Sequence, residues 1–266
     1  MASLIGPFGY PVQDFLRGAL VFLRITGVLF TVPIFGDNVT PPRVRILLGV
    51  ALTFGLYPII STKWMPEIPT DIIATALVVG RELFIGMVLG FVTKATFEGL
   101  VMAANLVGFQ MGFGTGSLFM AESEGQINSF AAMHKGIIML IFLSLSLHHL
   151  FIQGIVDSFT LIPGGLATGG TSLYEMIIHV SSGVFVVAIQ LAAPIIVALL
   201  FAMATMGLLA RAVPQLNVFV LSFPASFFVG LLIYIATLPF FPNWIRDHLI
   251  TEQETIRSAL LNLRPI

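Results

Sequence analysis

The chain has 266 residues, of which 57% are hydrophobic and only 9% are charged, and its mean hydropathy is +1.01. A soluble domain carries about 25% charged residues, so this chain has too little polar surface for a globule in water, and a soluble enzyme is excluded. Its net charge of −1 argues for no basic patch that would bind nucleic acid. Because the chain contains no cysteine, a disulfide framework, a thiolate metal site and a cysteine nucleophile are excluded as well.

Apolar segments follow one another along the chain. A helix needs roughly 20 apolar residues to cross a hydrocarbon core about 30 Å thick. Six or seven segments are predicted from the pattern: 15–35, 46–60, 72–93, 99–121, 136–156, 176–210 and 212–245. The first lacks the positive flank of a cleaved signal peptide, so we expect it to be retained. The chain is therefore predicted to be an all-α polytopic membrane protein.

The separators between these segments are short. In 36–45, Pro41-Pro42 is predicted to stop a helix, and 61–71 is typical of a loop at the membrane surface. The glycine-rich stretch 157–175 is the expected boundary between an N-terminal bundle and a C-terminal pair of helices. After Asn243, a favourable N-cap, residues 244–263 are predicted to form an amphipathic helix that lies on the membrane or docks on a partner. The Lys and Arg of the loops favour seven spans only mildly, so the topology stays open.

The last two apolar segments are too long for a simple span. A straight helix over the 35 residues of 176–210 would run ~52 Å. Either these helices kink, for example at Pro194 and Pro224, or they protrude into a protein environment. Between them, 211–217 is the natural tip of a helical hairpin.

Two ionisable residues, Arg81 and Glu82, lie inside the apolar segment 72–93. Charged groups at membrane depth usually face a bundle interior, a water-filled cavity or a partner charge. Adjacent helix residues point about 100° apart, so we expect the two to pair with different groups. The favoured interpretation is structural pairing between helices, with Arg24 as the candidate partner, over a role in proton or ion translocation.

Residues 108–120 form the most unusual stretch of the chain. Four glycines within nine residues make a stable helix improbable there, since each costs about 1 kcal/mol relative to alanine. One interpretation is a loop that blocks a pore with bulky apolar groups; the other is close helix packing through the G-x-x-x-G pair. The sequence supports these two interpretations about equally. The candidate residues are Gly108, Phe109, Met111, Gly112, Phe113, Gly114, Gly116, Phe119 and Met120.

Catalytic and cofactor patterns are weak. Ser117, with His148, His149 and His179, only loosely resembles an intramembrane serine protease, because the turn around the serine and the histidine spacing do not match. The histidines show no metal-ligand spacing, and neither a phosphate loop nor a dinucleotide fingerprint is present. We expect no enzymatic activity, no metal and no cofactor.

Three stretches together carry a family resemblance. They are Pro33-Ile34-Phe35-Gly36 with Pro41-Pro42-Arg43-Val44-Arg45; Gly80-Arg81-Glu82-Leu83-Phe84-Ile85-Gly86 leading to Gly108-Phe109-Gln110-Met111-Gly112; and Arg211-Ala212-Val213-Pro214-Gln215-Leu216-Asn217-Val218-Phe219. In order and spacing they resemble the FliR family, the R subunit of the flagellar type III protein export gate, and more distantly its injectisome counterparts. The third stretch is the most specific of the three.

This resemblance implies a non-enzymatic component of the export gate in the bacterial inner membrane, within the flagellar basal body. Such a subunit joins P-type and Q-type subunits in a helical spiral around a channel for unfolded export substrates. By resemblance, residues 1–156 are similar to the P-type subunit and 176–245 to the Q-type subunit, with 157–175 as the connection and 246–266 as the tail. Partner subunits, besides membrane lipid, would then surround the long helices.

The resemblance also assigns two sites. The family's channel plug maps onto about 108–120, although the acidic-proline turn that usually follows is replaced here by Met120-Ala121-Glu122-Ser123-Glu124-Gly125. The hairpin tip would face the cytoplasmic switch subunit at the channel entrance, through Arg211, Pro214, Gln215 and Asn217. The alternative class is a secondary transporter with an intramembrane Arg-Glu site, but the inverted repeats typical of that class are not found in the sequence.

Overall fold

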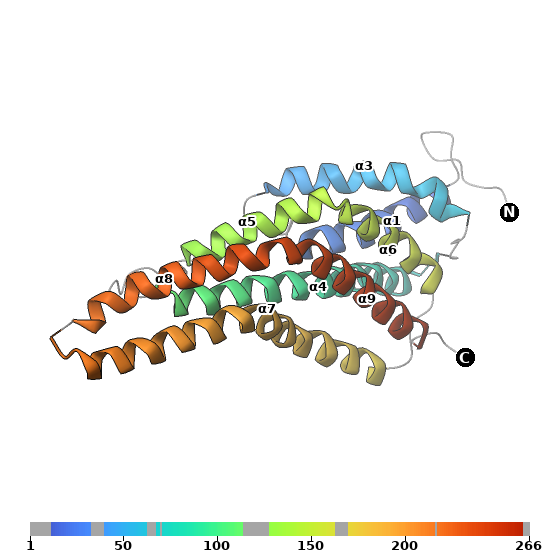
Figure 1. Ribbon diagram of the computed structural model, residues 1–266. Coiled ribbons are helices and arrows are strands. Elements are labelled where there is room, and N and C mark those ends of the chain that lie inside the picture. Colours follow the sequence, from blue (N-terminus) through green and yellow to red (C-terminus); the bar gives the residue numbers. More distant parts are fainter. Residues whose placement is uncertain are drawn as a thin grey trace. The chain divides into compact units, whose positions relative to one another are not determined.

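The secondary structure is helical throughout the part of the chain that the computed structural model describes, residues 12–32, 40–62, 68–69, 71–113, 128–162, 170–215 and 217–262 (Figure 1). The helices are α1 (Val12–Thr31), α3 (Pro42–Ser61), α4 (Ile72–Gln110), α5 (Ser129–Ser144), α6 (Leu147–Leu161), α7 (Gly170–Ala212), α8 (Val218–Thr237), the 3-10 helix η1 (Leu238–Phe240) and α9 (Phe241–Asn262). The predicted all-α fold is confirmed.

The chain divides into two compact units that do not follow chain order. Unit 1 comprises residues 1–95, 148–180 and 251–266, and unit 2 comprises 96–147 and 181–250. The helices α4, α7 and α9 each contribute a part to both units. The predicted division into a P-like and a Q-like part follows chain order and rests on resemblance. It is therefore not the same as these two units, and it stays a prediction.

Helix α1 provides most of the core of unit 1. Its apolar residues recur three and four positions apart, which places them on one face of the helix. They pack with residues of α3 and α6 and with partly buried residues of α4. The buried members of this core are Leu20, Val21, Ile25, Val28, Leu29, Val32, Ile60, Ile155 and Phe159.

The core of unit 2 includes the second half of α4. Buried residues of α5, α7 and α8 contribute to it, and the rings of Phe97 and Phe142 meet edge to face with centroids 5.4 Å apart. Its buried residues include Leu100, Ala103, Val107, Phe130, Ile138, Val187, Ala188, Ala192, Ile195, Leu199 and Tyr234.

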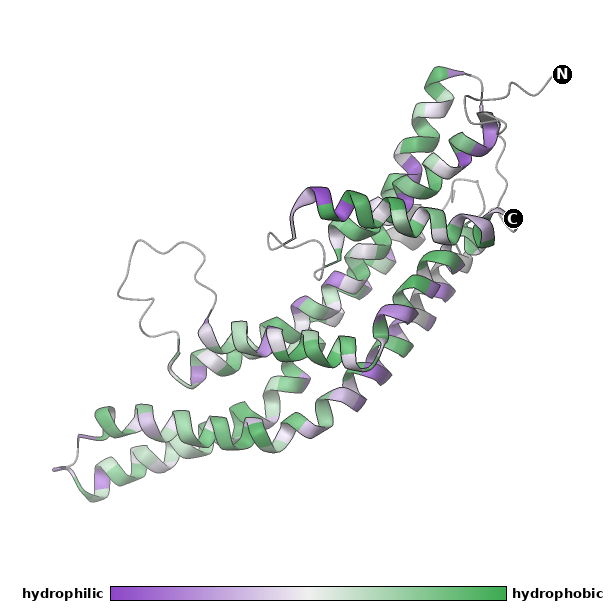
Figure 2. Cartoon of the chain, turned by 90° about the horizontal axis from the view of Figure 1, so that it is seen from above, coloured by the Kyte–Doolittle hydropathy of each residue, from purple (hydrophilic) through white to green (hydrophobic). Residues whose placement is uncertain are grey.

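Within the described ranges, four helical stretches are long and apolar enough to cross a membrane, namely 42–61, 72–110, 174–212 and 220–252. The pair α5 and α6, bent by 71° at its break, would make a fifth if it counts as one span. Green, apolar residues dominate these helices in Figure 2. The sequence leaves the number of spans open, and this count holds for the described residues. The predicted break between the segments 72–93 and 99–121 is wrong, because the exposed charges Lys94 and Glu98 lie within the single helix α4.

Three of the described prolines lie at or near the start of a helix. Pro42 is the first residue of α3, after Pro41 in the extended N-cap conformation, where the missing N–H of proline is tolerated. Pro239 lies in η1, and Pro242 lies in the first turn of α9. The expected N-cap at Asn243 is therefore wrong, because α9 already begins at Phe241. Pro194 and Pro224, the expected kink positions, lie inside α7 and α8.

Candidate functional site

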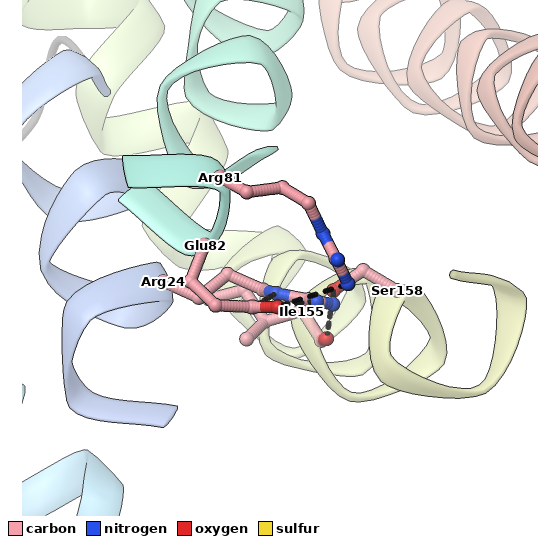
Figure 3. A network of polar contacts seen from close by, with 5 residues as sticks. All are labelled: Arg24, Arg81, Glu82, Ile155 and Ser158. Carbon is pink, nitrogen blue, oxygen red and sulfur yellow. Dashed lines mark hydrogen bonds and ion pairs between the residues drawn. The ribbon is translucent and has the colours of Figure 1, made fainter. Parts of the chain in front are cut away.

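A buried ion pair joins α1 to α4 inside unit 1 (Figure 3). The Arg24 Nε donates a hydrogen bond of 2.6 Å to Glu82 Oε2, and Arg24 Nη2 lies 2.6 Å from the same oxygen. Both side chains are 0% exposed. The predicted interhelical pairing of Glu82 with Arg24 is thus present, and its structural role, as against a role in translocation, stays a prediction.

Helix α6 completes the environment of Arg24. The Arg24 Nη1 donates to Ser158 Oγ at 3.2 Å, and the Ser158 hydroxyl donates in turn to the carbonyl of Ile155 at 2.6 Å. The guanidinium carbon also lies 4.0 Å from the centroid of the Phe159 ring, within the range of a cation–π contact. Arg24 therefore ties together three helices that are far apart in the sequence.

Arg81 lies on the other side of the same carboxylate. Its Nη2 is 3.7 Å from Glu82 Oε1, and its side chain is 10% exposed. The expectation that Arg81 and Glu82 pair with different groups is wrong for Arg81, because its long side chain bends back toward its neighbour (Figure 3). The network thus holds two guanidinium groups and one carboxylate among the described residues.

Small residues allow α1 and α4 to approach each other closely enough for this pair. A Cβ built on Gly27 of α1 would stand 2.7 Å from the carbonyl oxygen of Leu83 and 3.2 Å from the Cα of Gly86. Such backbone-to-backbone contact is typical of glycine pairs at membrane helix crossings. The crossing places Arg24 opposite Glu82.

The predicted plug stretch begins inside a helix. Helix α4 continues to Gln110, so Gly108 and Phe109 are helical instead of forming the start of a loop. The Gly112 N–H donates to the carbonyl of Phe109 at 3.1 Å and the Phe113 N–H to that of Gly108 at 2.9 Å, which together form a Schellman C-cap. Gly112 has a φ of +94°, which favours glycine. This glycine therefore ends α4. Gly114, Gly116, Phe119 and Met120 lie outside the described residues.

Side chains fix the end of α4 against its neighbours in unit 2. The amide of Asn128, which caps α5 by accepting from the Phe130 N–H at 3.0 Å, occupies the space that a Cβ on Gly108 would need. Met111 is buried and packs against Gly230 of α8. Among the described residues, the glycines at 108 and 112 face side chains rather than a helix backbone, and close packing of the G-x-x-x-G pair against another helix stays a prediction.

Aromatic residues of the predicted plug differ in their surroundings. The Phe113 ring centroid lies 5.8 Å from that of Phe130 on α5 and 5.6 Å from that of Phe227 on α8. Phe109 projects from the last turn of α4 and is 60% exposed. Of the five described candidates, Phe109 is thus the one whose bulk is mostly uncovered by this chain.

The predicted hairpin tip lies between the ends of α7 and α8 (Figures 1 and 2), and its described residues, 211–215 and 217, are exposed. Arg211 lies in the last turn of α7, where a positive charge is favoured by the helix dipole. Pro214 and Gln215 form the turn, and the Asn217 side chain caps α8 by accepting from the Val220 N–H at 3.4 Å. All four side chains are exposed.

Sequence reasoning missed one polar pair in unit 2. His134 Nδ1 lies 2.8 Å from the hydroxyl of Tyr234, with the rings of Phe130 and Phe241 around them. The spacing of Phe130, His134 and Ile138 on one helical face was the signal that His134 is buried. Among the described residues, no cluster of three or more His, Asp or Glu side chains suits a metal ion. Ser117, the nucleophile of the protease interpretation, lies outside the described residues.

Comparison with known proteins connects this architecture to a family. The sequence profile of the family described as "Bacterial export proteins, family 1" matches residues 15–251. The chain belongs to this family. Curated relatives are named flagellar biosynthetic protein FliR: that of Escherichia coli K12 is 26% identical over 92% of each chain. That of Bacillus subtilis is 28% identical over 91% of this chain and 93% of its own, and that of Caulobacter vibrioides 29% identical over 80% and 84%. The resemblance to the FliR family, predicted from three stretches, is confirmed.

Proposed function

We propose that the chain is a component of the flagellar protein export apparatus in the bacterial inner membrane. The match of the family profile from residue 15 to residue 251 carries this proposal. It is supported by relatives of that name over nine-tenths of the chain and by helices apolar enough to cross a membrane. The proposed location within the membrane is the flagellar basal body.

In more detail, the chain is an R-type subunit that assembles with P-type and Q-type subunits around a channel for unfolded flagellar proteins. The 43-residue helix α7 supports this role, since at about 1.5 Å per residue it runs about 64 Å, far beyond a hydrocarbon core. Partner subunits instead of lipid would cover the apolar face that this helix leaves open. Its exposed apolar residues include Phe185, Val186, Ile189, Val197, Leu200, Phe201 and Leu208.

Within that assembly, residues 108–120 form the plug of the channel and the hairpin tip contacts the switch subunit. Apolar constrictions close a pore by excluding water, and the exposed ring of Phe109 suits that role. At the tip, one cation and two amides on a proline-interrupted turn suit a protein partner better than lipid. The proposed contact residues are Arg211, Pro214, Gln215 and Asn217.

The proposal is tested by purification and by secretion. A tagged copy of the chain, extracted in mild detergent from its own bacterium, should bring P-type and Q-type subunits with it. The same chain expressed alone should aggregate or be degraded, and deletion of its gene should abolish secretion of the filament protein. A stable, well-behaved monomer or homo-oligomer, recovered without partners, would instead support the transporter alternative and reject the export role.

A further inference from the structure

The polar network of unit 1 carries one more positive than negative charge among the described residues. Its charged members are Arg24, Arg81 and Glu82. The Nε and Nη2 of Arg24 each lie 2.6 Å from Glu82 Oε2, and its Nη1 donates to Ser158 Oγ. Arg81 approaches only the other carboxylate oxygen, and its 3.7 Å separation is too long for a hydrogen bond.

The guanidinium of Arg81 has donors left over. Among the described residues, its Nε and Nη2 have no hydrogen-bond partner, although the side chain is nine-tenths buried. Glu82, which is committed to Arg24, is the one carboxylate that this part of the chain places within ion-pair distance of Arg81. A charge inside an apolar helix is costly unless another charge faces it. The described structure thus leaves one buried cation unbalanced.

We propose that Arg81 receives the carboxylate of an Asp or Glu side chain from a partner subunit when the chain assembles. The inference rests on the proposed function, which supplies such partners. The partner carboxylate would reach Arg81 through the 10% of its side chain that stays exposed. The planar guanidinium, with several N–H donors in one fork, is suited to a carboxylate that binds with both oxygens.

The depth of Arg81 favours a protein carboxylate over a lipid phosphate. Arg81 lies nine positions after Ile72, the first residue of α4 (81 − 72 = 9), which is about 14 Å along the helix. Measured from the start of the apolar segment 72–93, which Asp71 and Lys94 flank, that distance is about half of a 30 Å hydrocarbon core. Lipid phosphates lie outside this core, whereas a residue of a neighbouring membrane helix reaches this depth.

The first experiment compares variants in the complete assembly. The tagged chain is co-expressed with the P-type and Q-type subunits of the same bacterium, and the amount of partner recovered per chain is measured. Arg81→Glu should lower this recovery by about tenfold or more, as loss of a buried charge pair does. Arg81→Lys keeps the charge but loses the planar fork, so it should lower recovery less than Arg81→Glu does. Lys94→Glu, the same reversal at an exposed cation of α4, is the matched control and should leave recovery unchanged.

A charge swap identifies the partner group. In the Arg81→Glu background, each acidic residue in the membrane helices of the partner subunits is changed to Arg, and one of these changes should restore recovery. Arg81→Gln removes the charge without placing a second carboxylate beside Glu82. If Arg81→Glu fails to fold, this variant therefore replaces it in the measurement of partner recovery. It should lower recovery while the chain keeps the protease resistance of the parent.

Three results would overturn the inference. They are parental recovery with both Arg81→Glu and Arg81→Gln, an equal loss with Lys94→Glu, or no rescue by any acidic-to-basic change. Normal assembly with loss of bound phosphatidylglycerol, measured by mass spectrometry, would assign the anion to lipid and reject the protein carboxylate. A parent chain that recovers no partner overturns the proposed function itself, and this inference with it.

Discussion

Gly86 of α4 leaves open the space that the backbone carbonyl of Arg24 on α1 fills. A Cβ built on Gly86 would overlap that carbonyl oxygen and would lie 3.1 Å from its carbon and 3.2 Å from the Cα of Arg24. The close approach therefore concerns the backbone of the same residue whose side chain holds Glu82. Packing and charge pairing at this crossing depend on each other, because a wider crossing would also separate the ion pair.

Replacement of Gly86 by Ala should destabilise unit 1. The added methyl group meets backbone rather than a movable side chain, so the helices must separate, and overpacking of this kind costs about 1–3 kcal/mol. Gly80→Ala on the same helix is the control, since a Cβ there meets nothing within 4 Å. Thermal unfolding of the purified assembly in detergent should show a lower midpoint for Gly86→Ala only. Equal midpoints for the two variants would contradict the close crossing.

Removal of the Glu82 carboxylate should lower the yield of the assembly. In Glu82→Ala the fully buried Arg24 loses its counter-ion, and breaking a buried pair from one side costs about 3–5 kcal/mol. The double variant Arg24→Met, Glu82→Met removes both charges of the pair and should recover part of the yield. Assembled complex is measured per cell, together with secretion. Normal amounts of a complex that cannot secrete would reject the structural role and favour a role in proton transfer.

The charge pair could be predicted from the sequence, because ionisable residues inside apolar segments are easily recognised and nearly always need a partner charge. Arg24 and Glu82 each interrupt an apolar segment, and a charge at membrane depth needs a partner. The sequence did not predict that Arg81 shares the same carboxylate, because that depends on the rotamer of a long side chain. Nor does residue spacing say how closely the two helices cross; that follows from Gly27 and Gly86 facing each other in space.

Helix boundaries were predicted less well, for two physical reasons. The charges Lys94 and Glu98 predict a break between two segments, but charges mark contact with water or protein and do not break a helix. Of the two interpretations of the glycines after 107, the loop is wrong at its start, because Gly108 is helical and Gly112 is the residue that ends α4. Both errors come from judging residue composition without the hydrogen bonds that decide where a helix stops.

Replacement of Gly112 by Ala should destabilise the end of α4. A left-handed conformation costs an L-residue about 1–2 kcal/mol, and the new Cβ would lie 3.0 Å from the Phe223 ring. Gly136→Ala is the control, because Gly136 lies inside α5 with open space around it and alanine is the better helix former there. Hydrogen exchange of the amides around Phe113 should increase in Gly112→Ala. Unchanged exchange would contradict the C-cap.

A cysteine at Gln215 should crosslink to the switch subunit in intact cells. The chain has no cysteine of its own, so the introduced thiol is unique in it, and Gln215 is exposed in the turn between α7 and α8. Asn243→Cys, at another exposed position, tests whether crosslinking is specific to the tip. Crosslinks are detected by mass shift on gels. Labelling of Gln215→Cys from the periplasmic side alone would reject the proposed cytoplasmic contact.

A deletion in the plug must begin after the residues that end α4. Gly112 and Phe113 belong to the C-cap of α4, and Phe113 packs between Phe130 and Phe227. Removal of these two residues would disturb unit 2 itself. A deletion of residues 114–117 leaves the cap in place and shortens only the stretch beyond it. The complex should still assemble, because the anchoring contacts of Gly108 with Asn128 and of Met111 with Gly230 remain.

With assembly confirmed, membrane conductance is measured while no substrate is engaged. A passage wide enough for an unfolded chain must exclude ions at rest, and apolar groups do so by keeping water out. The shortened complex should therefore leak, and Phe109→Ala, which removes the most exposed bulky side chain among the described plug residues, should leak as well. Gly136→Ala serves as the control that stays closed. A deletion complex that assembles and remains as tight as the parent would show that another part of the channel forms the seal.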